Sequence, residues 1–241
     1  MPDSIIQSIT QDGVQYSIPL SHSKTDAIAL AYQILEGYGY PPHPSKWDAA
    51  LRNAKTRGVS DESAMQKLLP ADRHLGEVRA SEKLAEYDLA AVSEIWPYFV
   101  DAGAKYDVPP AVLAAIASRE SRCGALLKDG WGDFDEHGEP RAFGIMQIDK
   151  RWHKDVDRAN PSGLDHICQA TEIFRAKLDQ ICRKHPGWEE PYQLHGAIAA
   201  YNMGASNVQT VGGIDKGTTG DDYGADVLAR AQYYQARVGG S

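Results

Sequence analysis

The chain has 241 residues, of which 42% are hydrophobic and 24% charged, proportions that are typical of a soluble globular protein. The net charge of −8 argues against a nucleic-acid partner, because proteins usually grip phosphate backbones with basic patches. No apolar run reaches the roughly 20 residues of a membrane span, so we expect no membrane insertion.

The start of the chain has neither a basic segment nor a continuous apolar core, so we predict synthesis in the cytoplasm without a signal peptide. Cys168 and Cys182 fall in one predicted helix, where about 1.5 Å per residue separates them by roughly 21 Å. That distance exceeds disulfide reach. We therefore interpret these two cysteines and Cys123 as free thiols.

The first part of the chain predicts a small helical module, residues 1–80. Residues 1–20 alternate weakly, which indicates a short strand or an ordered arm. Helices are predicted from Ser23 to the Gly- and Pro-rich residues near 40, over about 45–56, and after Ser60, a good capping residue. A module of this size usually needs support from a neighbour.

Residues 81–241 predict a second, larger domain. Apolar residues recur at helical spacing in four segments besides the one that contains Glu120: 84–106, 164–184, 192–201 and about 221–237. Residues 143–148 predict a strand, with turn-rich sequence before it. We predict a mainly α (α+β) fold, a helical domain with a small antiparallel sheet at a cleft.

Glu120 stands out near the end of a predicted helix. Pro109 and Pro110 suit the first turn of that helix, and Gly124 suits the left-handed residue that ends it. Glu120 shares one face with the apolar residues three or four positions apart, which are Val112, Leu113 and Ile116. Burial there would raise the pKa of the carboxyl, as a general acid requires. The alternative is a structural ion pair with Arg119 or Arg122.

Two aspartates follow on short irregular segments. Asp133 closes the GWGD loop and Asp149 lies at the end of the predicted strand. Two carboxyl groups in contrasting environments are the minimum for hydrolysing a glycosidic bond, since one protonates the leaving oxygen and the other orients a water molecule. The alternatives are a loop cap for Asp133 and an ion pair with Lys150 or Arg151 for Asp149.

Five motifs occur in order from about Ala85 onward: SRES, GWGD, FGIMQIDKR, AAYNMGASNV and GTTGDDYGADVLARAQYY. Together they resemble the goose-type lysozymes, glycoside hydrolase family 23, which are related to the lytic transglycosylases. The resemblance implies a lysozyme-like fold, no cofactor and no metal. It implies Glu120 as general acid and Asp133 and Asp149 as the residues that hold the attacking water in an inverting reaction.

The resemblance also implies a set of substrate-binding residues, which are Gln147, His153, Ile173, Tyr201, Asn202 and Tyr223. Tyr223 matches a tyrosine whose hydroxyl approaches the catalytic glutamate. The alternative for the tyrosines is core packing with a satisfied hydroxyl. Lys177 stands where an aromatic residue is common, which would weaken one subsite.

Residues 134–142 depart from the family pattern, because this connection is longer than usual and adds three carboxylates. The insertion either repositions Asp133 or lets an inserted carboxylate share its work. His137 within it raises the thought of a metal site, but a lone histidine among loop carboxylates usually belongs to the solvated surface.

The N-terminal LEGYGY segment is weakly similar to three-helix peptidoglycan-binding modules. The alternative is a helical extension that only stabilises the larger domain.

The resemblance predicts a bacteriolytic muramidase that cleaves the β-1,4 bond between N-acetylmuramic acid and N-acetylglucosamine of bacterial peptidoglycan. A lytic transglycosylase and a non-catalytic wall-binding protein are the alternatives. We expect a monomer, and we leave open a dedicated inhibitor or immunity protein as partner. Without a signal peptide, release as a phage endolysin or delivery as a secreted effector would bring the protein to the wall. The alternative is a eukaryotic defence lysozyme, a class that usually carries a signal.

Overall fold

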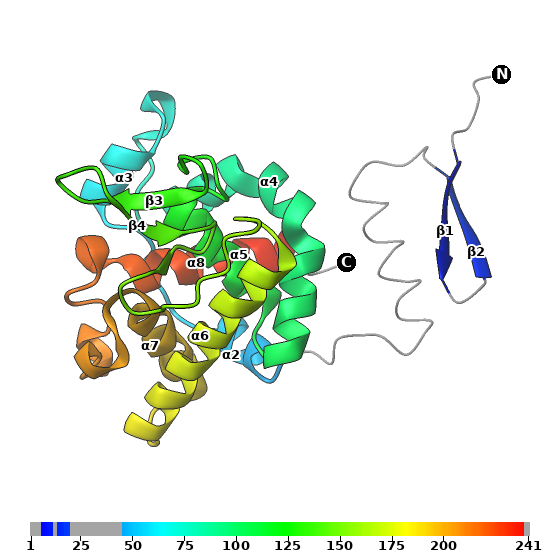
Figure 1. The fold of residues 1–241 in the computed structure, drawn as a ribbon. Helices are drawn as coiled ribbons and strands as arrows, with labels where there is room; N and C mark the ends of the chain where they lie inside the picture. The colour runs from blue at the N-terminus through cyan, green and yellow to red at the C-terminus, as the bar shows by residue number, and fades with distance from the viewer. Residues whose placement is uncertain (1–5, 12–13, 20–44, 239–241) are drawn as a thin grey trace. The chain divides into compact units, whose positions relative to one another are not determined.

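A computed structural model describes residues 6–11, 14–19 and 45–238 of the chain (Figure 1). The chain divides into two compact units, residues 1–43 together with Ser241, and residues 44–240. In the first unit, β1 (Ile6–Gln11) and β2 (Val14–Pro19) form an antiparallel hairpin, which confirms a strand in this region. The helix predicted from Ser23 lies outside the described residues.

The second unit is mainly helical, as predicted. Its described helices are α2 (Trp47–Asn53), α3 (Asp61–Lys67), α4 (Glu77–Tyr106), α5 (Pro110–Ser121), α6 (Leu164–Lys184), α7 (Glu190–Met203) and α8 (Tyr223–Arg237). Short 3-10 turns add Pro70–Asp72, Ala205–Asn207, Val211–Gly213 and Thr219–Asp221.

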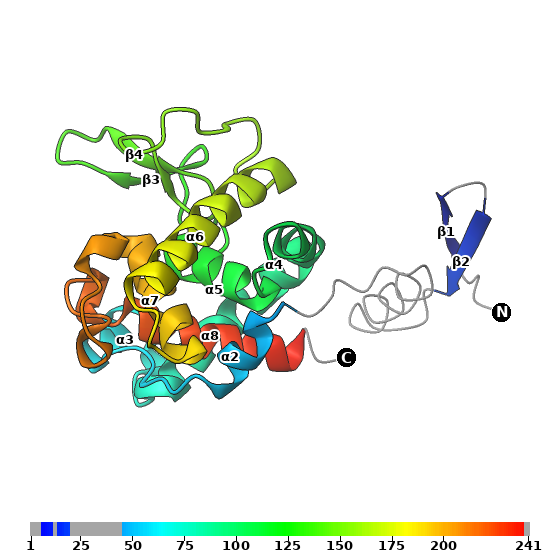
Figure 2. The same ribbon diagram turned by 90° about the horizontal axis from the view of Figure 1, so that it is seen from below.

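A three-stranded antiparallel sheet completes this unit, in the order β3 (Trp131–Phe134), β4 (Pro140–Phe143) and β5 (Ile148–Asp149). Figure 2 shows the β3–β4 hairpin at one edge of the helical body. The pairing places Ala142 opposite both Gly132 and Asp149, so the middle strand joins the two segments that carry the predicted aspartates.

Helix α5 forms the centre of the packing. Residues 111–118 are all buried, and α4 and α8 pack against them. Seven consecutive buried apolar residues explain why α5 needs no polar outer face over this stretch. The helix ends earlier than predicted, because Arg122 and not Gly124 is the first left-handed residue, with φ +53°.

The strand predicted over residues 143–148 is wrong. Strand β4 ends at Phe143, residues 144–147 form a turn, and β5 begins at Ile148. Gly144 has φ +76° and Gln147 has φ +51°, which extended strands do not allow. The apolar residues of this segment are buried in a turn and not in one extended strand.

Helices α2 and α3 pack on the larger helices. Gln232 of α8 donates to the carbonyls of Leu51 at 2.9 Å and Ala54 at 2.7 Å. Ser60, the N-cap of α3, donates through its N–H and hydroxyl to Asp222 at 2.8 and 2.7 Å. The compact unit thus begins at residue 44. A wall-binding role for residues 1–80 stays a prediction.

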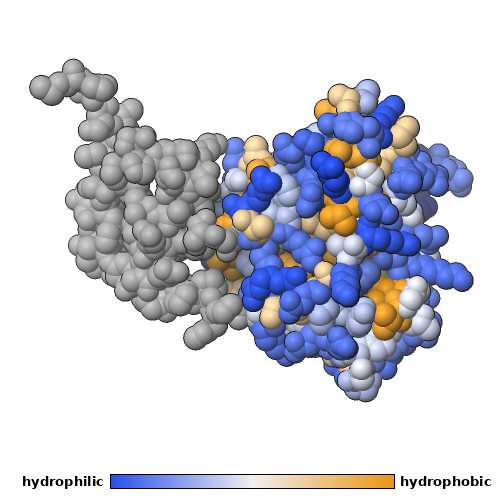
Figure 3. Space-filling view, turned by 180° about the vertical axis from the view of Figure 1, so that it is seen from behind, coloured by the Kyte–Doolittle hydropathy of each residue, from blue (hydrophilic) through white to orange (hydrophobic). Residues whose placement is uncertain are grey.

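The face shown in Figure 3 is mostly polar over the described residues, with small, separated apolar patches. None of the described helices is long and apolar enough to cross a membrane.

Candidate active site

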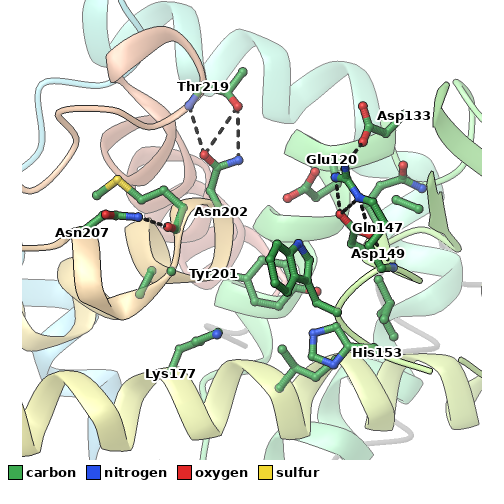
Figure 4. Close-up of a pocket in the computed structure, with 18 of the residues that line it drawn as sticks. Glu120, Asp133, Gln147, Asp149, His153, Lys177, Tyr201, Asn202, Asn207 and Thr219 are labelled. Carbon is green, nitrogen blue, oxygen red and sulfur yellow. Dashed lines mark hydrogen bonds and ion pairs between the residues drawn. The ribbon is translucent and has the colours of Figure 1, made fainter. Parts of the chain in front are cut away.

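A cavity of about 920 Å³ opens between the sheet and the C-terminal half of the unit (Figure 4). Its walls come from the end of α5, strands β3 to β5, the turn after β5, and helices α6 and α7. The side chains that line it include Glu120, Asp133, Gln147, Asp149, Arg151, Trp152, His153, Ile173, Lys177, Tyr201, Asn202 and Thr219. In Figure 4, Asp133 and Asp149 lie on one side and Asn202 and Thr219 on the other.

Glu120 lines this cavity, and its surroundings raise the pKa of its carboxyl. Burial raises the pKa of its carboxyl to about 7, opposed by the hydrogen bond from Tyr223 and by Arg119. The negative charge of Asp133 raises this pKa further. A carboxyl with a pKa near 7 is substantially protonated at neutral pH, which is what proton donation to a leaving oxygen requires.

The structural alternative for Glu120 is wrong, because its two neighbouring arginines pair elsewhere. Arg119 donates to Asp222 at 2.8 Å and to Asp226 at 2.5 Å, both on or beside α8. Arg122 donates to Asp88 at 3.1 Å. Both arginines that neighbour Glu120 in the sequence thus form ion pairs with other carboxylates in the folded protein.

The partner of Glu120 is Tyr223, the first residue of α8, whose hydroxyl donates to Oε1 of Glu120 at 2.6 Å. Tyr223 is only 1% exposed and does not line the cavity, so its hydroxyl contacts Glu120 from the protein interior. Arg119 lies over the Tyr223 ring, with its guanidinium carbon 5.6 Å from the ring centroid. The ion pairs of Arg119 therefore also fix the position of Tyr223.

The turn at residues 144–147 forms part of the cavity wall and is held from three helices. Ser121 of α5 donates to the carbonyl of Ile145 at 2.8 Å. His166 of α6 accepts the N–H of Met146 at 3.3 Å, and Tyr201 of α7 donates to the Met146 carbonyl at 2.8 Å. Burial lowers the pKa of His166 to about 4, so the ring stays neutral and can accept that bond.

Asp133 and Asp149 both line the cavity, and Arg151 lies between them. Arg151 donates to both carboxylate oxygens of Asp149, with Nε 3.0 Å from each. Its contact with Asp133 is longer, at 3.9 Å. The alternative ion pair foreseen for Asp149 is thus formed, and Arg151 holds the pKa of Asp149 below its usual range despite partial burial. Asp133 keeps an exposed carboxylate, with 57% of its side chain accessible.

The extra connection between β3 and β4 folds as a hairpin loop that closes on itself. The carboxylate of Asp135 accepts the N–H groups of His137 at 3.0 Å and Glu139 at 2.9 Å. These bonds and nearby Arg141 lower the pKa of Asp135. None of the inserted carboxylates lines the cavity. Across the described residues, no group of three or more His, Cys, Asp or Glu side chains is placed to hold a metal ion.

The residues predicted to bind substrate are brought together with one exception. Five of them line the cavity, and these are Gln147, His153, Ile173, Tyr201 and Asn202. The exception is Tyr223. Asn202 is fixed by Thr219, which donates its N–H to the Asn202 side chain at 3.0 Å. Arg151 and Trp152 also line the cavity, although neither was predicted as a site residue. Arg151 ends the FGIMQIDKR motif and Trp152 directly follows it.

The cysteines stand apart from this chemistry. None of Cys123, Cys168 and Cys182 forms a disulfide, as predicted. Burial raises the pKa of the Cys123 thiol far above its ordinary value, which removes it as a nucleophile at neutral pH.

A helical fold whose cleft joins a carboxyl of raised pKa to two aspartates defines a glycoside hydrolase of the lysozyme type. Residues 49–238 match the family described as "Lysozyme g". The chain is 44% identical to "Lysozyme g" of Casuarius casuarius over 180 residues, 75% of this chain and 91% of that protein. It is 41% identical to "Lysozyme g" of Takifugu rubripes over 193 residues, 78% and 97% of the two chains. A third relative, "Lysozyme g" of Gallus gallus, is 44% identical over 198 residues, 82% and 84% of the two chains. The chain belongs to the lysozyme g family.

Proposed function

We propose that this member of the lysozyme g family is a muramidase that hydrolyses the β-1,4 bond between N-acetylmuramic acid and N-acetylglucosamine in bacterial peptidoglycan. The observation that carries the proposal is the environment of Glu120: a carboxyl of pKa about 7 in a cavity of about 920 Å³, held by Tyr223. Glu120 donates its proton to the bridging oxygen as the glycosidic bond breaks.

The second half of the reaction needs a base for water, and Asp133 is the better placed of the two aspartates. Its side chain is 57% exposed, against 21% for that of Asp149, and its carboxylate makes one long ionic contact, at 3.9 Å. Both oxygens of Asp149 are occupied by Arg151, and a carboxylate of lowered pKa is a weaker proton acceptor. We therefore assign the water to Asp133 and a positioning role to the Asp149–Arg151 pair. This arrangement favours an inverting hydrolysis, in which water attacks the face opposite the leaving group.

The three relatives named above come from animals, so the expectation of a phage endolysin receives no support from them. Because peptidoglycan lies outside the bacterial membrane, we propose that the protein acts extracellularly on bacterial walls. The monomeric state and an inhibitor or immunity protein stay predictions.

The test is a product analysis by mass spectrometry on purified sacculi. Hydrolysis gives products with a reducing N-acetylmuramic acid end, whereas a lytic transglycosylase gives 1,6-anhydro ends and needs no base for water. We expect reducing ends from the unaltered chain, no products from Glu120→Gln, and a larger loss of rate for Asp133→Asn than for Asp149→Asn. Exclusive 1,6-anhydro products would contradict the proposal, and full activity of Glu120→Gln would remove its basis.

A further inference from the structure

Trp152 is an anomaly on the surface. Its side chain is 80% exposed, more than any other large hydrophobic residue in the described part of the chain. The other exposed residues of this kind are Met65, Leu69, Tyr98, Leu126, Phe134 and Val211, and none of them lines the cavity described above. Trp152 does line it. The most exposed aromatic side chain thus stands at the cleft where the substrate must bind.

The position of Trp152 is fixed by the strand that carries Asp149. The carbonyl of Asp149 accepts the N–H of Trp152 at 3.2 Å and the N–H of His153 at 3.0 Å. The side chain of Asp149 also accepts the N–H of Arg151 at 2.8 Å. This tight turn, with the ion pair of Arg151, holds residue 152 at the rim next to the proposed water-binding side of the cleft. These bonds fix the backbone at Trp152, and its exposed indole is accessible to a ligand in the cleft.

The chemistry of the cavity indicates which ligand. An indole offers a flat apolar face of large area, and the CH face of a pyranose ring is its usual complement in sugar-binding sites. Ile173 adds apolar surface to the same cavity, and Asn202 and Gln147 add amide groups that can pair with hydroxyl and acetamido groups. Lys177 also lines the cavity and has no ion-pair partner among the described residues.

We propose that Trp152 forms a sugar-stacking subsite of the cleft, in which its indole face covers one N-acetylhexosamine ring of the glycan. The subsite rests on the function proposed above and deepens it, because it identifies a specificity-determining residue. Trp152 contributes to binding of the glycan and not to the chemical step, since it carries no group that exchanges protons with the scissile bond. The stacking is insensitive to salt, whereas binding through Lys177 would weaken as salt screens the charge.

The experiment measures binding of a neutral N-acetylglucosamine hexamer by isothermal titration calorimetry, in the Glu120→Gln background so that the ligand is not cut. We expect Trp152→Ala to weaken binding about tenfold, which corresponds to about 1.4 kcal/mol. Trp152→Tyr should retain most of the affinity, because a smaller ring still stacks. The matched control is Phe134→Ala, which removes an aromatic residue that is 43% exposed on β3 and does not line the cavity. It should change affinity less than twofold.

A second readout uses turnover of sacculi with Glu120 intact. Trp152→Ala should raise KM and leave kcat within about twofold, and thermal melting should be unchanged, because an exposed side chain contributes little to the fold. Unchanged affinity and KM in Trp152→Ala, with the unaltered chain active, would overturn the subsite alone. Equal losses in Trp152→Ala and Phe134→Ala would overturn it as well. If the unaltered chain neither bound the hexamer nor cut sacculi, the proposed function would fail, and the subsite with it.

Discussion

Removal of one hydroxyl, Tyr223→Phe, tests how the cleft sets the acidity of Glu120. The hydroxyl donates to Glu120 at 2.6 Å, and this bond opposes the effect of burial that raises the pKa to about 7. A hydrogen bond to a charged group contributes about 1.5–3 kcal/mol. At about 1.4 kcal/mol for each pKa unit, its loss should raise the pKa of Glu120 by roughly 1 to 2. Phenylalanine keeps the buried ring, so the packing around α8 should survive.

The assay is the pH dependence of kcat/KM on a soluble peptidoglycan fragment. The acid must be protonated, so activity falls as pH rises through the pKa of Glu120, near 7 in the unaltered chain. In Tyr223→Phe this alkaline fall should move to higher pH by roughly 1 to 2 units. The matched control is Tyr234→Phe, because Tyr234 lies on the same helix, is fully buried and donates to the carbonyl of Ala85 at 3.0 Å.

The control should lose stability of about 1 kcal/mol, the usual worth of a buried hydrogen bond, and keep the alkaline fall in place. The reasoning would be refuted if the fall stayed fixed in Tyr223→Phe, or moved equally in both variants. A shift to lower pH would mean that the hydroxyl stabilises the neutral carboxyl.

Three further predictions concern the fold that supports the site. Because the pKa of Glu120 is raised from 4.5 to about 7, its contribution to the free energy of unfolding is full below about pH 4.5 and is lost as pH rises through about 7. Glu120→Gln should therefore be more stable than the unaltered chain by up to about 3 kcal/mol at pH 8 and equally stable at pH 4, as measured by urea unfolding. Arg119→Met leaves Asp222 buried without this cation and should cost about 3–5 kcal/mol, and an unchanged melting temperature would contradict the importance of the pair. Gly144→Ala places a Cβ 2.1 Å from the His166 ring at a residue with φ +76°, so we expect a loss of about 2–4 kcal/mol and of activity, checked by calorimetry and turnover.

A network of ion pairs lies beside Tyr223, the residue that donates a hydrogen bond to Glu120, and it stabilises the position of that tyrosine. Arg119 joins Asp222 and Asp226 across the start of α8, and Arg230 pairs with Asp226 at 2.9 Å. These paired charges lower the pKa of Asp226, so its stabilising effect is present above its unfolded pKa near 3.9 and is lost as pH falls below that value. The enzyme should therefore lose stability in strong acid.

Local patterns of residues predicted the helices of the second unit and the catalytic candidate, although α4 begins at Glu77 and not at residue 84. Apolar periodicity over residues 164–184 predicted the bounds of α6, and Pro109 and Pro110 predicted where α5 begins, since they are its N-cap and its first residue. Both signals are local, because helical hydrogen bonds join residues four positions apart. Glu120 was recognisable for the same reason: its spacing from apolar residues of α5 put a carboxyl on a face that must be buried.

The surroundings of that carboxyl depend instead on long-range packing. The turn at 144–147 is set by Pro161, His166 and Tyr201, between 16 and 55 positions away, so the apolar run alone indicated a strand. The choice between Tyr223 and a neighbouring arginine as partner for Glu120 depends on α8, 103 residues further along. Ion pairs and turn conformations depend on which distant groups the packing brings together, and no local pattern in a sequence records that.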